Sequence, residues 1–493
     1  MCKNKHGHFN QLGEIIQMAS LEEQKNQLLT FLNHSDDLVQ HQLHLHNEAI
    51  LFYIEGLTDG NVLKENVLKP LLQSINEIDL LYCSKIITTN TTRVDTWKEV
   101  TEGLLEGQSV LFVNGIKGAL IINTKGWAER PIQEPVSEST INGSHDGFIE
   151  NASKNLGLIR RYIPSPQLKV KKMTVGERAP TQVYIIYLVD VANNDIVEEI
   201  KKRIKNIKTD TILNTGELSN FTKRQIWTPF PHSYLSERPD AITRHILDGK
   251  IAVLVDRSPS AMVVPMNFIG FFQTPDDYSL HWIIASSLRL LRLLGFFIAI
   301  FLPSIYIAMV TFHFEVIPLN LYLSIAHSRI KVPFSPLMEA LMMEFTLEML
   351  REAGVRLPQS IGQTIGIVGG IVIGQAAVQA GIVSNVMVIV VSVTAIASFI
   401  VSNYDLATCI RFIRFPMMLF SYAFGLVGIV TAMMMLLAHI ITLNSFGAPY
   451  GLPLAPLYLN DWKDSFIRFP ISMLTKRSSV GNPQQKRKKK YKG

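Results

Sequence analysis

Charged residues are missing from a long stretch of this chain: no Asp, Glu, Lys or Arg occurs between Leu357 and Tyr404. A helix needs about 20 apolar residues to cross the hydrocarbon core of a membrane, so this stretch is long enough for two crossings. We expect a turn near Gly381 to separate them. Two more uncharged runs, 293–312 and 416–443, predict a third and a fourth crossing. The pattern indicates an α-helical polytopic membrane domain with four strong spans.

Two weaker apolar segments lie among the strong ones. Segment 316–326 is too short to cross directly, and we interpret it as re-entrant or interfacial. Segment 335–352 is apolar but carries four Glu residues. If this segment crosses, another segment must cross as well, because both ends of the chain are expected on one side.

The distribution of charge sets the expected topology. Residues 476–493 hold eight Lys or Arg and no acid, so the positive-inside rule places this tail in the cytoplasm. The net charge of +6 owes much to this tail, and a membrane-proximal run is favoured over nucleic-acid binding. The N-terminal MCKNKHGHFNQLGEII has no apolar h-region, so no signal peptide is expected. Arg289 and Arg292 flank the first span, which favours a cytoplasmic N-terminal half.

An internal repeat organises the residues before 278. LEGQSVLFVN at 105–114 resembles LDGKIAVLVD at 247–256, with an offset of 142 positions from Gly107 to Gly249 (249 − 107). Each copy reads as a helix end, a glycine cap, a strand, a tight turn and a second strand. The repeat predicts two related α/β subdomains joined near 161–166.

The predicted fold is a cytoplasmic α/β region of two subdomains followed by the helical membrane domain. The expected parts are an N-terminal helical extension (1–44), a first subdomain (45–163), a second subdomain (164–277), a transmembrane domain (278–445) and a basic cytoplasmic tail (446–493).

Neither subdomain shows the motifs of an enzyme. No GxGxxG, P-loop, Ser/His/Asp spacing or metal-ligand cluster occurs in them, so we expect no catalytic residue, no cofactor and no metal. Cys2, Cys83 and Cys409 have neither metal-like nor disulfide-like spacing. The two lobes favour an assembly platform, and small-molecule binding in their cleft stays open as the alternative.

One segment carries a family resemblance. PFPHSYLSERPD at 229–240 resembles the signature of the A subunits of bacterial spore germinant receptors, the GerA family. The similarity covers most of residues 45–475, including the charge-free stretch and SFGAPYGLPLAP at 445–456. The matching signature residues are Pro229, Phe230, Pro231, Glu237, Arg238, Pro239 and Asp240.

Three positions depart from the family pattern. Ser144 and His145 stand where the family has Pro and Arg, so no role of that arginine transfers to this chain. His232 replaces the second Pro of the family's PFPP.

The resemblance implies one component, the A-type protein, of a nutrient receptor that triggers germination, located in the spore inner membrane with both termini on the cytoplasmic core side. It implies two partners, a transporter-like B subunit that binds the nutrient and a lipoprotein C subunit. It also implies a homo-oligomer, a pentamer, that forms a channel for monovalent cations within the membrane lipid. Nucleic acid is not an expected partner, and the residues do not identify the nutrient.

The first half of the charge-free stretch carries two opposite faces. One is a glycine stripe typical of close helix packing: Gly362, Gly366, Gly370 and Gly374. The other face has polar ends and two valines in the middle: Thr364, Val368, Val372, Gln375 and Gln379. In a ring of identical chains this second face would line a pore, with a hydrophobic constriction that gates by dewetting. The alternative is a span packed on all sides within a single chain.

The segment with four Glu residues is a second candidate site. Glu344, Glu348 and Glu352 fall on one helical face, and a ring of carboxylates attracts cations, so we interpret them as a cation vestibule. The alternatives are an interfacial helix whose Glu side chains face solvent, or pairing with Arg351 and Arg356.

Two functions follow from these patterns and the resemblance. One is an oligomeric, nutrient-gated cation channel. The other is a non-conducting membrane scaffold that couples a nutrient-binding partner to a later step. A solute transporter is less favoured, because no inverted repeat is visible.

Overall fold

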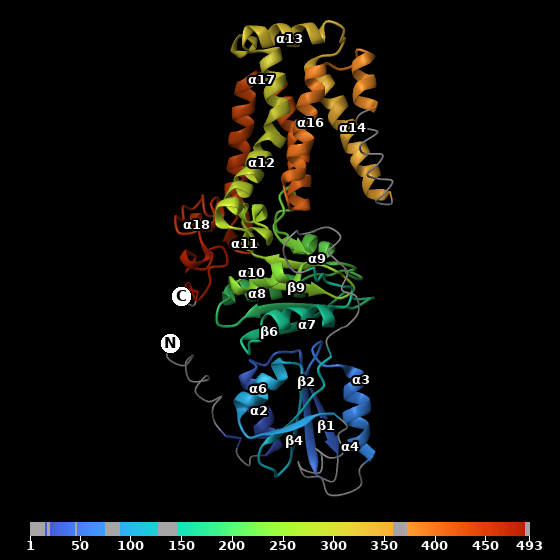
Figure 1. Ribbon diagram of the computed structural model, residues 1–493, viewed down its shortest axis with the longest axis vertical. Helices are drawn as coiled ribbons and strands as arrows, with labels where there is room; N and C mark the ends of the chain where they lie inside the picture. Colours follow the sequence, from blue (N-terminus) through green and yellow to red (C-terminus); the bar gives the residue numbers. More distant parts are fainter. Residues whose placement is uncertain are drawn as a thin grey trace.

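The computed structural model describes residues 15–16, 20–44, 47–73, 89–126, 145–357, 370 and 372–488. Two α/β lobes lie at one end of the molecule and a bundle of long helices at the other (Figure 1). Both lobes are built on antiparallel sheets, so the predicted α/β N-terminal region is confirmed.

The first lobe is a five-stranded sheet in the order β1-β2-β4-β5-β3, with helices on both faces. Successive residues of a strand point to opposite faces. Phe52 of β2 therefore packs under α2 and α6, while Leu51 packs against Val67 on the other face. The elements are α2 (Leu21–Phe31), β1 (Leu38–His44), β2 (Glu48–Ile54), α3 (Gly60–Val62), a π-helical turn (Leu63–Leu68), α4 (Lys69–Gln73), β3 (Thr91–Val94), α6 (Trp97–Leu105), β4 (Ser109–Val113) and β5 (Ala119–Ile122).

The second lobe repeats this arrangement in the order β6-β7-β9-β10-β8. Its two apolar cores lie on opposite faces of the sheet, one under α7 and α10 and the other under α8. The elements are α7 (Ala152–Tyr162), β6 (Leu168–Val175), β7 (Thr181–Leu188), α8 (Asn194–Lys205), α9 (Thr215–Thr222), β8 (Tyr234–Ser236), α10 (Pro239–Leu247), β9 (Ile251–Val255) and β10 (Ala261–Val264).

The repeat in the sequence is a repeat in the structure. The starts of α6 and α10, of β4 and β9, and of β5 and β10 all differ by 142 positions (239 − 97, 251 − 109 and 261 − 119). Gly107 and Gly249 follow the two helices with φ of 87° and 90°, a conformation that L side chains rarely adopt.

Two expected boundaries differ from the structure. The sequence predicts a helical extension over 1–44, but β1 begins at Leu38 and pairs with β2. The sequence also assigns α7 to the first subdomain, 45–163, but Leu156 and Ile159 of α7 pack on the second sheet. The reason is that each repeat begins with a helix before its first hairpin, α2 in the first lobe and α7 in the second.

A buried ion pair joins the two lobes. Arg160 and Asp37 are each 1% exposed, and the guanidinium donates from two nitrogens to the two carboxylate oxygens at 2.8 and 3.0 Å. Beside this pair the amide of Val170 donates to Ser35 Oγ at 2.9 Å, so the α2–β1 loop docks on the edge strand β6. The bidentate geometry fixes the orientation of one lobe on the other.

We expect Arg160→Gln to destabilise the chain, because Asp37 would stay buried without its counter-charge. Breaking a buried pair from one side costs about 3–5 kcal/mol. Thermal unfolding of the full chain in detergent should begin at a clearly lower temperature. The control is Arg178→Gln, which breaks an exposed pair with Asp210 on the same lobe and should change little. Equal losses in both variants would contradict a coupling role for Arg160.

The helical region follows the second lobe. By length and composition α12 and α17 are apolar and long enough to cross a membrane, whereas α16 has 16 residues. Helix α13 lies across the far end of the bundle (Figure 1). It includes residues 319–326 of the segment predicted to be re-entrant or interfacial. The elements are 3-10 helix Ile269–Phe272, α11 (Asp276–Ser279), α12 (Trp282–Thr311), 3-10 helix Phe314–Val316, α13 (Leu319–Arg329), α14 (Pro336–Arg356), helical residues 372–379, α16 (Asn385–Ile400) and α17 (Tyr404–Thr442).

Helix α17 folds back on itself at Gly425, where φ is 61° and ψ is −140°. Gly425 lies at the far end of α12, because a Cβ there would be 2.6 Å from Cε1 of His313. Both ends of α17 lie at the second lobe: Tyr404 shares a groove with Thr228, and His439 Nε2 is 2.8 Å from the Thr228 hydroxyl. The expected span 416–443 is therefore not one straight crossing, since α17 consists of two antiparallel arms.

The chain after α17 returns to the second lobe. It forms β11 (Asn444–Ser445), β12 (Ala448–Pro449), α18 (Trp462–Ser465) and a 3-10 helix (Ile471–Met473). The amide of Gln484 donates to Val191 O at 2.8 Å, and Lys488 pairs with Asp248 at 2.7 Å. The expected basic tail is therefore not a free solvated run as far as Lys488. Its contacts place it on the same side of the helices as the lobes.

Candidate functional site

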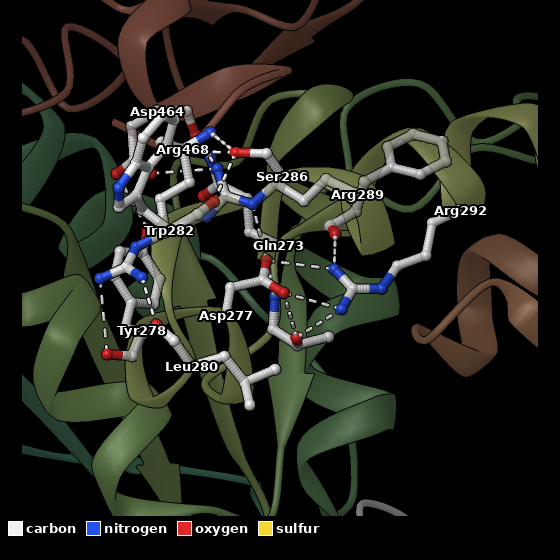
Figure 2. A network of polar contacts seen from close by, with 12 residues as sticks. Gln273, Asp277, Tyr278, Leu280, Trp282, Ser286, Arg289, Arg292, Asp464 and Arg468 are labelled. Carbon is white, nitrogen blue, oxygen red and sulfur yellow. Dashed lines mark hydrogen bonds and ion pairs between the residues drawn. The ribbon is translucent and has the colours of Figure 1, made fainter. Parts of the chain in front are cut away.

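Buried charges join the second lobe to the helices (Figure 2). Asp277, in α11, is 0% exposed and accepts from two arginines in the first turns of α12. Arg289 Nε and Arg292 Nη2 each lie 2.7 Å from one of its carboxylate oxygens. Arg292 also donates to Phe272 O at 2.8 Å and to Thr274 Oγ1 at 3.0 Å, so this helix end is tied to the loop before it.

The segment after α17 enters the same network. Arg289 Nη1 lies 3.0 Å from Oδ1 of Asp464, in α18. The Tyr278 hydroxyl donates to Oδ2 of Asp464 at 2.9 Å, and Gln273 Nε2 donates to its carbonyl oxygen at 2.6 Å. Arg468 Nη1 donates to Leu280 O at 2.9 Å, which adds a second tie to the loop (Figure 2).

The two carboxyl groups of this network differ in their electrostatics. Burial raises the pKa of Asp277, but the hydrogen bonds and charges of Arg292 and Arg289 outweigh it and hold that pKa below its ordinary value. Burial dominates at Asp464 and raises its pKa, despite Arg289 and the Tyr278 hydroxyl. Asp277 is thus the fixed negative charge around which the two arginines are arranged.

This site can transmit a displacement from one part of the chain to another. It joins three parts of the chain: the loop at the base of the second lobe, the start of α12 and the segment after α17. A displacement of the lobe must move α12 or break charge-assisted hydrogen bonds, which are stronger than neutral ones.

We expect Asp277→Asn to loosen this junction, because Arg289 and Arg292 lose their shared counter-charge. Loss of one partner of a buried pair costs about 3–5 kcal/mol. Limited proteolysis of the full chain in detergent should then cut between the second lobe and α12. Asp276→Asn, one residue away and half-buried, is the control and should resist cleavage as the parent does. If Asp277→Asn is cleaved like the parent, Asp277 does not hold the second lobe to α12.

The signature segment lies at the other contact between the second lobe and α17. Phe230 is buried, with its ring centroid 6.0 Å from that of His439 and 6.3 Å from that of Tyr450. Arg238 pairs with Asp240 at 2.7 Å at the start of α10. Pro239 is the first residue of α10, and Glu237 O accepts from Phe148 N at 2.7 Å. Pro229 and Pro231 line the groove beside Tyr404.

His232 occupies this contact where the family has Pro. Its side chain is buried, and neither ring nitrogen has a hydrogen-bond partner among the described residues. Burial, aided by the charges of Lys223 and Arg203, lowers the pKa of His232 to about 4. The ring is therefore neutral at pH 7 and packs edge-on against Tyr450.

We expect His232 to make the fold sensitive to acid. An unfolded His titrates near pH 6.5, whereas the folded ring takes its proton only near pH 4, so stability is lost as the pH falls between these values. His232→Phe should remove about 2 kcal/mol of the stability difference between pH 7.5 and pH 5. Chemical unfolding of parent and variant at both pH values measures it. An unchanged pH difference would show that His232 does not bind a proton on unfolding.

The predicted pore-lining residues are only partly within the described residues. Thr364, Val368, Gly362 and Gly366 lie outside them. Val372 is 57% exposed, and Gln375 and Gln379 are exposed beside it. Gly374 is buried, and a Cβ on it would meet Val388 of α16 at 3.7 Å, whereas a Cβ on Gly370 would meet nothing within 4 Å. The pore lining stays a prediction.

The three glutamates of the expected vestibule do not form one open surface. Glu344 is 1% exposed and pairs with Arg414 of α17, which also donates to Ala299 O at 2.8 Å. Glu348 lies 3.3 Å from Arg351 and 3.6 Å from Arg411. Glu352 is exposed and lies 2.5 Å from Arg356. The charge of Glu344 is already neutralised inside this chain, so it joins α14 to α17 and is not a free carboxylate for cations.

We expect Glu344→Gln to impair folding rather than only ion flux, because Arg414 would be left as an unpaired buried charge, at a cost of about 3 kcal/mol or more. The yield of monodisperse protein in detergent should fall. Glu352→Gln is the control and should behave like the parent. The double variant Glu344→Leu with Arg414→Met removes both charges and should restore the yield. A normal yield for Glu344→Gln alone would contradict the pairing.

The sequence did not predict the residues that carry these junctions, namely Asp277, Asp464 and Arg414. A signal was present, because an arginine inside an apolar helix requires a partner. Distant partners could not be named, since Glu344 lies 70 positions from Arg414 and Asp464 lies 175 from Arg289. Asp277 is only 12 positions from Arg289, but nothing in the sequence singled it out. In the described part of the chain no group of three or more His, Cys, Asp or Glu side chains is placed to hold a metal.

These features define a class: a two-lobed antiparallel α/β region locked by buried charges to a bundle of apolar helices. Comparison with known proteins gives the family. Residues 26–480 match the family described as the Bacillus/Clostridium GerA spore germination protein. The chain belongs to the GerA family.

Individual relatives agree with this assignment. The chain is similar to spore germination protein A1 of Bacillus subtilis (39% identity over 461 residues, 93% of this chain and 95% of that protein). It is similar to spore germination protein GerLA of Bacillus cereus (37% over 479 residues, 94% and 96%). It is also similar to the uncharacterized membrane protein YfkQ of Bacillus subtilis (36% over 475 residues, 94% and 93%).

One solved structure is similar to part of the chain. It is the crystal structure of the N-terminal domain of the A subunit of the Bacillus megaterium spore germinant receptor GerK3. The match has 28% sequence identity and a TM-score of 0.41, and covers 52% of this chain and 98% of that one.

Proposed function

We propose that this chain is the A-type component of a nutrient germinant receptor and that it forms, as a homo-oligomer, a nutrient-gated cation channel in the spore inner membrane. The names of its relatives support the receptor part. The observation that carries the channel part is the open face of residues 372–379. Val372 and two glutamines stand exposed there, while Gly374 on the other side meets α16.

The number of crossings in this proposal is six rather than four. Helix α14 and the first arm of α17 both carry charges, but Glu344 and Arg414 neutralise each other between them. A paired charge is tolerated within a membrane far better than a single one. The crossings are α12, α14, the first of the two crossings predicted between Leu357 and Tyr404, α16 and the two arms of α17. Six is even, in keeping with a tail that contacts the second lobe.

Gating in this proposal acts through the junction. Two partners complete the receptor, a lipoprotein C subunit and the nutrient-binding B subunit. The two lobes serve as the cytoplasmic platform on which copies of the chain meet, five in a ring. Movement of a lobe reaches α12 through Asp277 and Arg289. Helix α12 approaches α16 closely, since a Cβ on Gly295 would lie 3.1 Å from Ala397 O. Helix α16 in turn contacts the helical residues 372–379, where a Cβ on Gly374 would meet Val388 at 3.7 Å.

We expect the Val372→Ser channel to conduct cations in the absence of nutrient. A hydrophobic ring keeps a closed pore dry, and a hydroxyl from each copy of the chain would wet it. Purified protein in planar bilayers should pass more cation current than the parent without nutrient, and spores carrying the variant should germinate spontaneously.

The matched control is Val393→Ser, an equally small change at an exposed position of the neighbouring helix α16. It should stay closed. If the Val372 variant assembles normally, passes no more current than the parent and keeps spores dormant, the face of 372–379 does not line a gate. The non-conducting scaffold would then be the better description.

A further inference from the structure

A cavity of about 120 Å³ lies beside the junction, and Gln273, Tyr278 and Asp464 of the junction form part of its wall. The second lobe contributes Arg244 and Lys250 to its wall, and the segment after α17 contributes Lys463 and Lys476. One ordered water needs roughly 10–15 Å³ of such space, so the cavity has room for a molecule of about ten non-hydrogen atoms.

The carboxylates of this cavity are already satisfied. Asp248 pairs with Lys488 at 2.7 Å. Asp461 accepts from the amide and hydroxyl of Ser479 at 2.8 and 2.5 Å. Asp464 belongs to the junction described above. The negative charges on the wall are therefore committed to other groups.

Four cationic side chains of the wall are not paired in this way. Among the described residues no carboxylate lies within ion-pair distance of Lys250, Arg244, Lys463 or Lys476. Lys250 is 4% exposed, and its ammonium contacts only His245 Nδ1 at 3.3 Å and Met266 Sδ at 3.0 Å. Burial lowers the pKa of His245 well below its ordinary value, so this ring brings no charge.

Lys250 therefore brings into the protein a charge that no carboxylate of the described chain contacts directly, although the charge of Asp248 acts on it from a greater distance. Burial lowers the pKa of Lys250 to about 8, so the ammonium is still protonated at pH 7. A buried unpaired charge is costly, and a bound anion removes that cost. Arg244 lies with its guanidinium 3.6 Å from the centre of the Tyr278 ring. A stacked guanidinium keeps its edge free to donate two parallel hydrogen bonds to a carboxylate or phosphate.

We propose that this cavity binds a small oxyanion, a molecule carrying a carboxylate or phosphate group, between Lys250 and Arg244, with Lys463 and Lys476 at the rim. The bound anion would touch the second lobe, the loop before α12 and the segment after α17 at once. Occupancy would stiffen the connection between lobes and helices. This binding site is independent of the channel proposal, since it requires no pore.

The test measures unfolding temperature of the purified full chain in detergent at pH 7. The probes are inorganic phosphate and succinate, each compared with sodium chloride of equal ionic strength. An anion at 100 times its Kd adds about 2.7 kcal/mol of stability, so we expect a saturating rise of a few degrees above the chloride value. Lys250→Met should weaken the apparent affinity at least tenfold (about 1.4 kcal/mol). Lys205→Gln, an exposed lysine of α8, is the control and should bind as the parent does.

Arg244→Gln and Lys476→Gln keep the test decisive if Lys250→Met does not fold, and each should weaken binding. A response to phosphate alone identifies a phosphate ligand, and a response to succinate alone identifies a carboxylate. A response to both supports the shared oxyanion chemistry. If neither anion exceeds chloride, or if the Arg244 and Lys476 variants respond as the parent does, the proposal is wrong.

Discussion

Buried arginine side chains join the parts of this molecule at three of its interfaces. A guanidinium stays charged when it is buried, so a carboxylate in matching geometry stabilises it, and the pair then fixes how two elements meet. The chain uses this constraint at three levels: Arg160 with Asp37 between the lobes, Arg289 and Arg292 with Asp277 between lobe and helices, and Arg414 with Glu344 between helices. Apolar surface fills the space around these pairs, but it is less specific about orientation.

The fold of the lobes was predictable because its signals are local. The glycines at 107 and 249, and the alternating apolar strands after them, mark the same unit twice, and the structure repeats them with the same strand order. The boundaries of the two lobes were harder to predict from the sequence. Whether a helix such as α7 belongs to the sheet before or after it depends on packing between distant segments, and Arg160 of α7 contacts both lobes.

The helical region shows where reasoning from charge fails. A count of uncharged residues locates α12 and α16 but misses the first arm of α17, because Arg411 and Arg414 interrupt its apolar run. Their partners lie in α14, which looks too acidic to be buried for the same reason. Glu344 and Arg414 each place a charge in an apolar helix, and these two charges cancel where α14 and α17 meet. The helical periodicity of 335–352 predicts one face for the glutamates, but it could not show that Glu344 faces another helix.

The turn at Gly425 brings the end of the last helix back beside the start of the first, so the helical bundle is an insertion within the second lobe. Residues 445–452 complete that lobe: Ser445 accepts from Met266 N at 3.0 Å, and Tyr450 is buried against Phe268. During translation Phe268 emerges 182 residues before Tyr450 (450 − 268). At ribosomal speeds of about 5–20 residues per second, the apolar surface of the lobe stays uncovered for roughly 10–35 s. The last contacts of the lobe can therefore form only after all of the helices have been synthesised.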